Sequence, residues 1–278
     1  MSALVRRQTA RWLEFVYGDR PDLDDPAEAY HEASKLAPSR IDRQMEGARR
    51  LAASPDLRLS SLRAVKRHGG ARIPLPEPAS LDVRLQDVIG RRRSRRDFAS
   101  GPIPGDALAA LLHAGYGVTG QLEPQDDRPR VPLRAVPSGG ALYPLELYAV
   151  AVRVTNLEPG LYHFDPLWPG LELLRSGLAV EELAVLSTYP DIASSCAVLI
   201  FVAAVFGRTR FKYGLRGYRF ALLEAGHVAQ NLLLAATALG LGAVPLGAFF
   251  DRRTDAILRL DGVNESTLYA IALGRERS

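Results

Sequence analysis

The side chains best suited to bind an anion lie in the segment Arg91–Phe98, which reads Arg-Arg-Arg-Ser-Arg-Arg-Asp-Phe. Within it, Arg92 and Arg96 flank Ser94 at a spacing of two residues. Arginine guanidiniums bind phosphate oxygens in pairs, and a serine hydroxyl adds a neutral donor. The pattern therefore favours a phosphate site. A run of arginines is also typical of a solvated face, a nucleic-acid patch or a membrane-facing stripe.

Two glycine-rich segments follow later in the chain, Pro137–Pro144 and Gly240–Gly247. Because glycines lack side chains, their backbone amides can approach a planar ligand closely, and Ser138 adds a donor to the first segment. In the second segment, we expect the backbone after Pro245 to lie along the edge of a flavin ring, with the Gly247 N–H at its atom N5. The alternatives are an ordinary turn for the first segment and a helix stop that leads into a strand for the second.

A candidate pair for proton transfer is Lys212-Tyr213, within the segment Phe211–Gly214. Lysine and tyrosine are poor core residues, and both can move protons in a cationic or desolvated setting. Arginines stand nearby at positions 208, 210, 216 and 219. We expect this segment to be a loop directly before a buried helix. The alternative is an exposed basic loop without a catalytic role.

From Ser80 onward, capping residues, prolines and glycines recur regularly and indicate the helices and strands that would position these residues. Helices are expected from Ser80 to Gly90, after Pro104, and over Tyr218–Leu239, where the polar face is so small that the helix must be buried in a core or at a dimer seam. The polar segment 121–132 predicts a mobile loop. Strands are expected at 147–154, 161–164, 171–174, 197–206 and 268–273.

The composition bounds the class of protein. The chain has 278 residues, a net charge of +4 and one cysteine, Cys196, which excludes an intramolecular disulfide framework and a cysteine-rich zinc site. The five histidines lack the spacing of metal ligands, so no metal is expected. The charged N-terminus predicts neither a signal peptide nor a membrane span, and hence a soluble, cytoplasmic protein. Prolines interrupt residues 1–79, which we expect to form an accessory arm of helical and extended segments, whereas residues 80–278 form one domain.

Several of these segments, taken in order, resemble the FMN-dependent nitroreductase superfamily. They are the arginine run, the turn at 137–144, Gly-Tyr-Arg-Phe at 217–220, Glu-Ala-Gly-His at 224–227 and Gly-Leu-Gly-Ala-Val-Pro at 240–245. The chain looks most like the SagB/McbC-type azoline dehydrogenase branch, over about residues 80–275. The upstream segment Ala29–Lys35 also looks like that branch. Where many simple nitroreductases have Asn and Gln-Pro-Trp in the turn, this chain has Ala141 and Tyr143-Pro144-Leu145, which favours the peptide-oxidising branch.

The resemblance implies an α+β fold with a central mixed or antiparallel sheet flanked by helices, in an intertwined homodimer with FMN at the interface. Lys212-Tyr213 matches the pair that azoline oxidases use in proton transfer, although which of the two is the base stays open. By the same matching, the residues expected to bind FMN are Arg92, Ser94, Arg96 and Arg275 for the phosphate and ribityl chain, Ser138, Gly139 and Gly140 for the ring, and Pro245, Leu246 and Gly247 for its N5 edge.

The implied reaction is the oxidation of a thiazoline or oxazoline ring in a peptide to thiazole or oxazole. The implied partners are that peptide and an enzyme or carrier that presents it, such as a cyclodehydratase or a carrier protein. Nucleic acid and membranes are not expected partners. Two alternatives stay open: an NAD(P)H-dependent flavin or nitro reductase on the same fold, and a non-catalytic scaffold subunit of a peptide-modifying complex.

Overall fold

The computed structural model describes residues 26–41, 45–62, 65–122, 130–178 and 180–277. It contains two compact units, residues 1–46 and 47–278. The described part of the first unit holds helix α2 (Pro26–Ala33) and the short 3-10 helix η1 (Pro38–Arg40). Residues 47–79 of the expected arm therefore belong to the same unit as the sheet.

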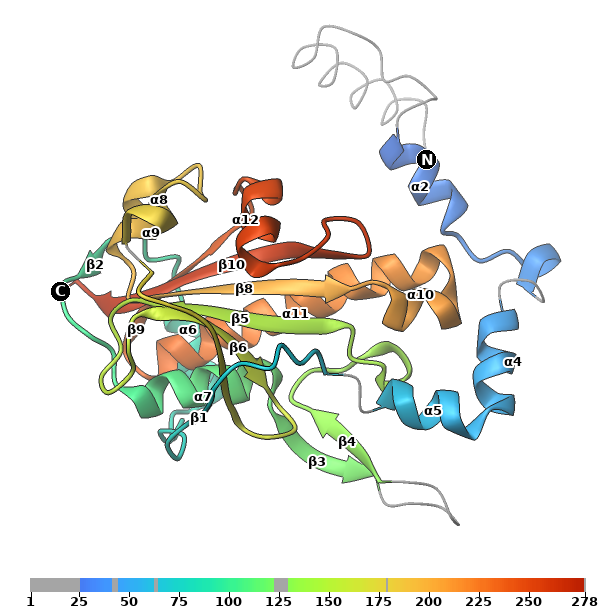
Figure 1. The fold of residues 1–278 in the computed structure, drawn as a ribbon, viewed down its shortest axis with the longest axis horizontal. Coiled ribbons are helices and arrows are strands. Elements are labelled where there is room, and N and C mark those ends of the chain that lie inside the picture. The colour runs from blue at the N-terminus through green and yellow to red at the C-terminus, as the bar shows by residue number, and fades with distance from the viewer. Residues whose placement is uncertain (1–25, 42–44, 63–64, 123–129, 179, 278) are drawn as a thin grey trace, which may run out of the picture. The chain divides into compact units, whose positions relative to one another are not determined.

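The second unit is built on one eight-stranded sheet in which all the strand pairings are antiparallel (Figure 1). The strand order is β1-β7-β6-β5-β8-β10-β2, and β9 also pairs with β10. The strands are β1 (Arg72–Pro74), β2 (Phe98–Ala99), β5 (Leu145–Ala151), β6 (Gly160–Asp165), β7 (Gly170–Ser176), β8 (Val198–Val205), β9 (Leu241–Leu246) and β10 (Glu265–Glu276). Strand β8 reads Val-Leu-Ile-Phe-Val-Ala-Ala-Val, and such continuous apolar runs are typical of strands buried on both faces.

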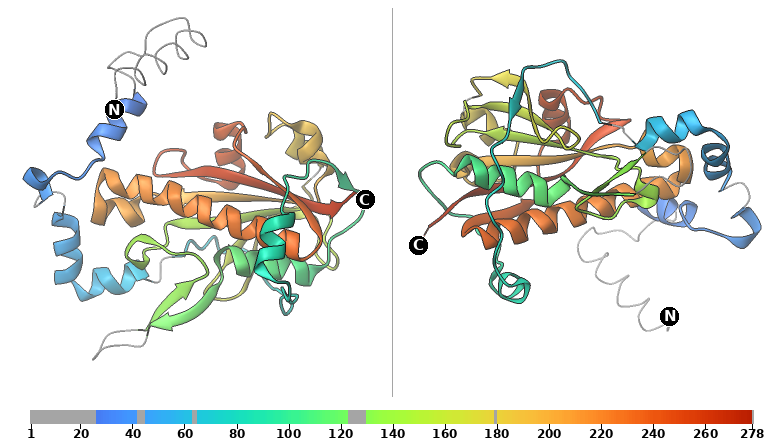
Figure 2. Two further views of the ribbon diagram at one scale, coloured as in Figure 1. Left: turned by 180° about the vertical axis from the view of Figure 1, so that it is seen from behind. Right: turned by 90° about the horizontal axis from the view of Figure 1, so that it is seen from below.

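Helices cover both faces of this sheet (Figures 1 and 2). One hydrophobic core lies between the sheet and the pair α7 (Gly105–Tyr116) and α11 (Leu215–Ala238), where Leu108 and Leu232 are fully buried. The other core lies under the helices α8 (Val180–Ala184), α9 (Pro190–Ser195) and α12 (Asp251–Leu258). The remaining helices are α4 (Glu46–Ala53), α5 (Pro55–Leu62), α6 (Leu85–Arg91), η2 (Gly139–Ala141) and α10 (Gly207–Tyr213). The expected α+β fold with an antiparallel sheet flanked by helices is confirmed.

One sequence expectation about local structure is wrong. The segment with Lys212 and Tyr213 is a helix, α10, and not a loop. It is held by Thr209, whose buried hydroxyl donates to the Gly217 carbonyl at 3.0 Å. The segment 121–132, expected to be a mobile loop, begins and ends in the paired strands β3 (Val118–Leu122) and β4 (Val131–Arg134), and its residues 123–129 lie outside the described residues.

Candidate active site

Lys212, Tyr213 and Gly140 meet at one end of the sheet. Strand β5 pairs with β8, and the Val205 amide donates to the Pro144 carbonyl at 2.8 Å. The end of the turn before β5 therefore lies beside the start of the helix after β8. A Cβ atom on Gly140 would lie 2.5 Å from Lys212 Nζ and 2.7 Å from Tyr213 Oη. Because Gly140 also has a φ of +68°, only glycine fits here. The structure thus brings the expected proton-transfer pair to the turn expected to bind the ring.

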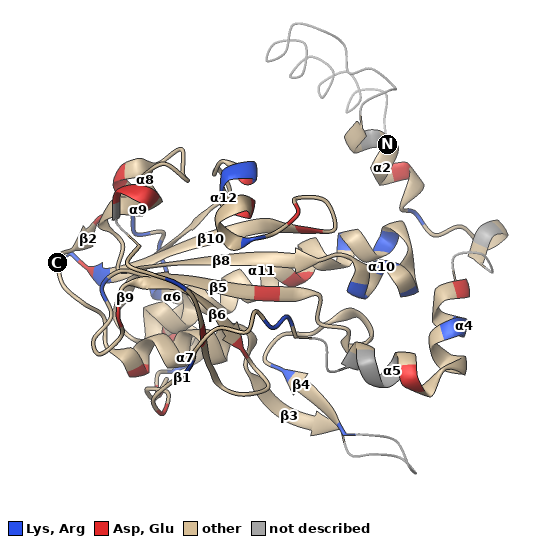
Figure 3. Cartoon of the chain, in the orientation of Figure 1, with Lys and Arg blue, Asp and Glu red and all other residues tan. Residues whose placement is uncertain are grey.

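An aromatic ring from α11 packs against this turn. Phe220 packs edge-on against Tyr213 with ring centroids 5.0 Å apart, and a Cβ on Gly139 would lie 3.0 Å from the same phenyl ring. Lys212 Nζ lies 5.0 Å from the Tyr213 ring centroid. Figure 3 shows the basic residues of α10 gathered at this end of the sheet. Small residues and aromatic edges therefore surround one ammonium group and one phenol.

Beneath the turn lies a buried polar cluster in which Tyr116 and Arg134 belong to no motif found in the sequence, whereas Glu224 lies in the segment Glu-Ala-Gly-His at 224–227. Tyr116 donates a hydrogen bond of 2.6 Å to Glu224 Oε1 and accepts one of 3.1 Å from the Leu145 amide. The Arg134 guanidinium lies 4.4 Å from the Tyr116 ring centroid. Ser138 Oγ accepts a hydrogen bond from the backbone amide that closes the turn. A single acid in the apolar helix Tyr218–Leu239 was the available signal for this cluster.

Burial decides the protonation state of this cluster. Desolvation raises the pKa of Glu224 to about 7, although the Ser138 and Tyr116 hydroxyls and the Arg134 guanidinium oppose the rise. Glu224 Oε2 and two nitrogens of Arg134 are buried without a hydrogen-bond partner among the described residues. Desolvation and the neighbouring Glu224 raise the pKa of Tyr116 well above its usual range. Below about pH 7, a protonated acid and a neutral phenol therefore support the turn.

The other face of the sheet holds the turn through a buried ion network. Glu146 accepts hydrogen bonds from Arg208 Nη2 at 2.6 Å and from the Lys66 amide at 2.8 Å, and its Oε2 lies 2.7 Å from His163 Nε2. Arg208 Nη1 also lies 3.4 Å from the Tyr143 carbonyl oxygen, so it links helix α10 to the turn. Burial opposes ionisation, but His163 and Arg208 hold the pKa of Glu146 at about 2. The carboxylate is therefore charged and fixes the start of α10.

The expected phosphate ligands lie around the ends of β2 and β10. In the arginine run, Arg93 donates to the Gly90 carbonyl at 3.0 Å, and Arg95 forms an ion pair of 2.7 Å with Glu276. The side chains between and beside them have no hydrogen-bond partner among the described residues; these are Arg92, Ser94 and Arg96. These three side chains therefore leave donors available to an anion.

Arg275 and the segment Pro245–Gly247 lie at different points along β10, since Arg275 pairs with Leu241 of β9 whereas Pro245 pairs with Ile271 and Leu246 with Ala270, four and five residues nearer to Glu265. Arg275 pairs with Ala99 of β2, and a Cβ on Gly101 would lie 3.1 Å from Arg275 Nη1. Gly247 follows the end of β9 directly and is exposed, and a Cβ added to it would meet nothing within 4 Å. Its amide has no backbone hydrogen-bond partner among the described residues. Gly247 therefore offers a backbone donor at the end of β9.

One copy of the chain does not bring all of the expected ligands together. On β10, Arg275 pairs with Ala99 at one end, whereas Glu265 pairs with Val205 at the other, next to α10. Ten residues of extended chain between them span about 33 Å. The phosphate ligands therefore lie at the opposite end of the sheet from Gly140 and Lys212.

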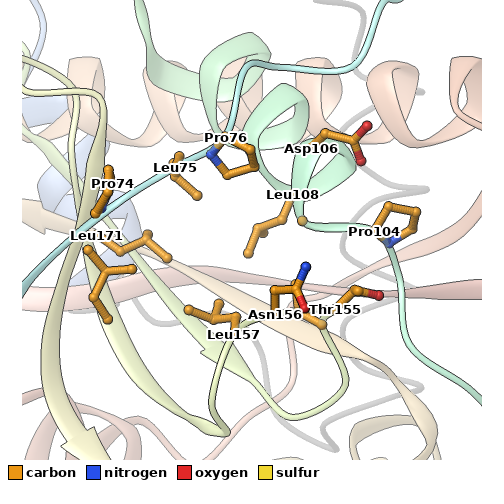
Figure 4. A pocket seen from close by; sticks show the side chains of 13 residues that line it. Pro74, Leu75, Pro76, Pro104, Asp106, Leu108, Thr155, Asn156, Leu157 and Leu171 are labelled. Atoms are coloured by element: carbon orange, nitrogen blue, oxygen red, sulfur yellow. The ribbon is translucent and has the colours of Figure 1, made fainter.

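Other parts of the described chain offer little alternative chemistry. A cavity of about 800 Å³ lies between β1, the start of α7 and the loop 154–157 (Figure 4), but none of the expected site residues lines it. The described residues hold no cluster of three or more His, Cys, Asp or Glu side chains suited to a metal ion. Every described helix is too short or too polar to cross a lipid bilayer.

Comparison with known proteins assigns the chain to a family. A model described as the Nitroreductase family matches residues 89–275. The chain belongs to the nitroreductase family. It is 35% identical over 207 residues to MJ1384 of Methanocaldococcus jannaschii, named as a nitroreductase, and the match covers 74% of this chain and 98% of that protein. Family membership makes a flavoprotein oxidoreductase the expected class.

Two further relatives are named for peptide processing. The chain is 30% identical to the trifolitoxin-processing protein TfxB of Rhizobium leguminosarum and to the microcin B17-processing protein McbC of Escherichia coli. These matches cover 52% and 46% of this chain but only 40% and 49% of the two relatives. They support the SagB/McbC-type branch of the family.

Solved structures confirm the fold. A nitroreductase-family crystal structure from Anabaena variabilis aligns with a TM-score of 0.62 and 29% identity over 75% of this chain, which spans 42% of that one. The Escherichia coli microcin synthetase McbBCD complex, with truncated pro-MccB17 bound, aligns with a TM-score of 0.56 and 20% identity over 100% of this chain and 99% of the other. At that identity, the second match shows the fold alone.

Proposed function

We propose that this chain is an FMN-dependent dehydrogenase that oxidises thiazoline or oxazoline rings in a peptide to thiazole or oxazole. The observation that carries the proposal is the convergence of Lys212 Nζ and Tyr213 Oη on Gly140. A reductase that takes hydride from a nicotinamide needs no such pair. The names of TfxB and McbC, which both refer to peptide processing, also support the proposal.

The reaction removes one proton and one hydride from the azoline ring. A bound flavin supplies the two-electron acceptor for the hydride, and molecular oxygen serves as the final oxidant. The adjacent C=N bond raises the acidity of the ring α-proton, so a neutral amine or a phenolate suffices as the base. Lys212 Nζ and Tyr213 Oη are the groups positioned to accept that proton. The Glu146–Arg208 pair holds α10, and with it this base, against the turn.

We infer that two copies of the chain complete each site. Arg92, Ser94, Arg96 and Arg275 from one copy would bind the FMN phosphate, and Pro245–Gly247 would lie at the ring edge. The turn Ser138–Gly140, with Lys212 and Tyr213, would come from the other copy, because these groups stand at opposite ends of the sheet. Helix α11 supports such a seam, since it leaves Leu222 and Leu223 42% and 57% exposed.

The cyclised substrate would come from a partner that converts Cys, Ser or Thr of a peptide into an azoline. The McbBCD complex holds a truncated pro-MccB17, and this chain has the fold of a component of that complex. We therefore propose a peptide substrate presented by a cyclodehydratase or by a carrier protein. The protein is proposed to act in the cytoplasm, where its single cysteine would stay reduced.

The test is the variant Lys212→Ala, with Arg210→Ala as its control. Arg210 lies on the same helix but is exposed. The purified protein should show a flavin absorption spectrum, and an azoline peptide should lose the mass of two hydrogens. We expect Lys212→Ala to keep the flavin spectrum and to lose turnover, while Arg210→Ala keeps both. Azole formation at the wild-type rate by Lys212→Ala would remove Lys212 from the mechanism.

The similarity to MJ1384, which covers nearly all of that protein, favours a nitroreductase as a second candidate. Rapid bleaching of the flavin absorbance by NADPH in a stopped-flow instrument would support the reductase. A protein that purifies without flavin and does not bind added FMN would instead support the non-catalytic scaffold.

A further inference from the structure

A cavity of about 260 Å³ lies beside the proton-transfer pair. One wall comes from the end of the turn and from α10, and includes Gly140 and Lys212. The opposite wall comes from helices α4 and α5, which lie upstream of the region that the family model matches. The α4 and α5 residues in this wall are Ala48, Leu51, Ala52 and Ser61.

Helix α4 is packed directly against the backbone of α10. A Cβ atom on Gly47 would collide with the Phe211 carbonyl oxygen and would lie 2.9 Å from Lys212 Cα. No side chain fits between the two helices at this point, so glycine is required. Because backbone meets backbone there, the position of the α4 wall relative to Lys212 is fixed.

The α4 wall is small and apolar. Residues 48, 51 and 52 have the spacing i, i+3 and i+4, which puts them on one face of a helix. Leu51 is only 7% exposed. The cavity is therefore apolar on one side and carries an ammonium group on the other. Its volume is below the range of about 300–1,000 Å³ that encloses drug-sized ligands, so it fits a five-membered ring with one neighbouring side chain.

We propose that this cavity binds the azoline ring of the peptide together with the side chain of the residue before the ring, and that Ala48, Leu51 and Ala52 limit the size of that side chain. The inference rests on the proposed function, because Lys212 must reach the ring proton. It assigns the selection of substrate to helix α4, outside the family-matched region. The nicotinamide ring of a dinucleotide is the competing occupant.

The experiment compares Ala52→Trp with Ala53→Trp. Both alanines are exposed on α4, but only Ala52 lines the cavity. Two peptides carry the same thiazoline, preceded by glycine or by leucine. The measurements are kcat and KM for each peptide, the Kd of each fluorescently labelled thiazole product by anisotropy, and the flavin content. We expect Ala52→Trp to weaken binding about tenfold or more, most strongly for the leucine peptide, at unchanged flavin content, while Ala53→Trp resembles the wild type.

A second variant approaches the cavity from the other helix. Ser61→Trp should also weaken peptide binding, and it decides the question if Ala52→Trp does not keep the native circular dichroism spectrum. Equal peptide affinities for the wild type and all three variants would overturn the inference, as would loss of NADPH affinity in place of peptide affinity. If the wild type oxidises neither peptide, the proposed reaction fails, and the anisotropy measurement still decides whether the cavity binds the ring.

Discussion

The buried acid under the turn makes a prediction about stability. Glu224 is only 2% exposed, and burial raises its pKa to about 7. The substitution Glu224→Gln replaces it with a neutral group of the same shape. The amide oxygen can still accept the hydrogen bond that Tyr116 donates to Oε1. The variant therefore imitates the protonated acid at every pH.

The size of the effect follows from linkage. The folded protein holds the Glu224 proton up to a pH of about 7, whereas an ordinary glutamate releases it near 4.5. This difference is worth about 3 kcal/mol of folding free energy. Because the folded-state pKa is raised, that stability is fully present below about pH 4.5 and is lost as the pH rises through about 7. Relative to the wild type, Glu224→Gln should gain nothing near pH 4 and about 3 kcal/mol near pH 8.

Urea unfolding of both proteins at a series of pH values between 4 and 8 measures this difference. The variant Glu181→Gln, at an exposed position of α8, corrects for the loss of one negative charge. A difference between Glu224→Gln and the wild type that stays constant from pH 4 to 8 would refute the reasoning. So would a variant that becomes relatively less stable as the pH rises, since that result requires an acid whose pKa is lowered by folding.

Three further predictions concern the turn, the phosphate site and the second buried acid. Gly140→Ala should lose turnover because its Cβ would meet Lys212 and Tyr213, whereas Gly177→Ala, with a similar φ of +69° but open space around it, should cost only about 1 kcal/mol of unfolding free energy. Arg92→Gln should weaken FMN binding about tenfold in a fluorescence titration, whereas Arg93→Gln should not. Glu146→Gln should lower the free energy of unfolding by about 3 kcal/mol at pH 7, because the folded-state pKa of this acid is lowered to about 2. In acid unfolding, this difference from the wild type should shrink as the pH falls from 5 towards 2.

The sequence predicted those elements whose signal is local. The apolar run of β8 and the long helix α11 were found because each pattern lies within one element. Helix α10 was taken for a loop, since its position depends on the contact of Thr209 with Gly217 and on the ion pair of Arg208 with Glu146. No periodicity within seven residues contains that information.

The candidate site shows the same division between local and distant information. Motifs identified residues individually, but the sheet topology determines their separation, with about 33 Å of β10 between the two groups. Tyr116 and Glu224 are 108 positions apart in the sequence and touch only because α7 packs on α11. An acid in an otherwise apolar helix or strand, such as Glu224 or Glu146, was the one local signal that this support existed.

The turn is supported by two buried acids whose pKa values are shifted in opposite directions. Successive residues of β5 face opposite sides of the sheet, so Leu145 points to the core that contains Tyr116, whereas Glu146 points to the other side. Below the first face, burial keeps Glu224 protonated up to about pH 7. On the second face, an arginine and a histidine keep Glu146 charged. Only the charged acid binds Arg208 and so anchors α10, while the protonated one adds no negative charge beneath the turn below about pH 7. Exchanging the two environments would place a carboxylate beneath the turn Ser138–Gly140 at every pH above about 2, and would release the helix that carries Lys212.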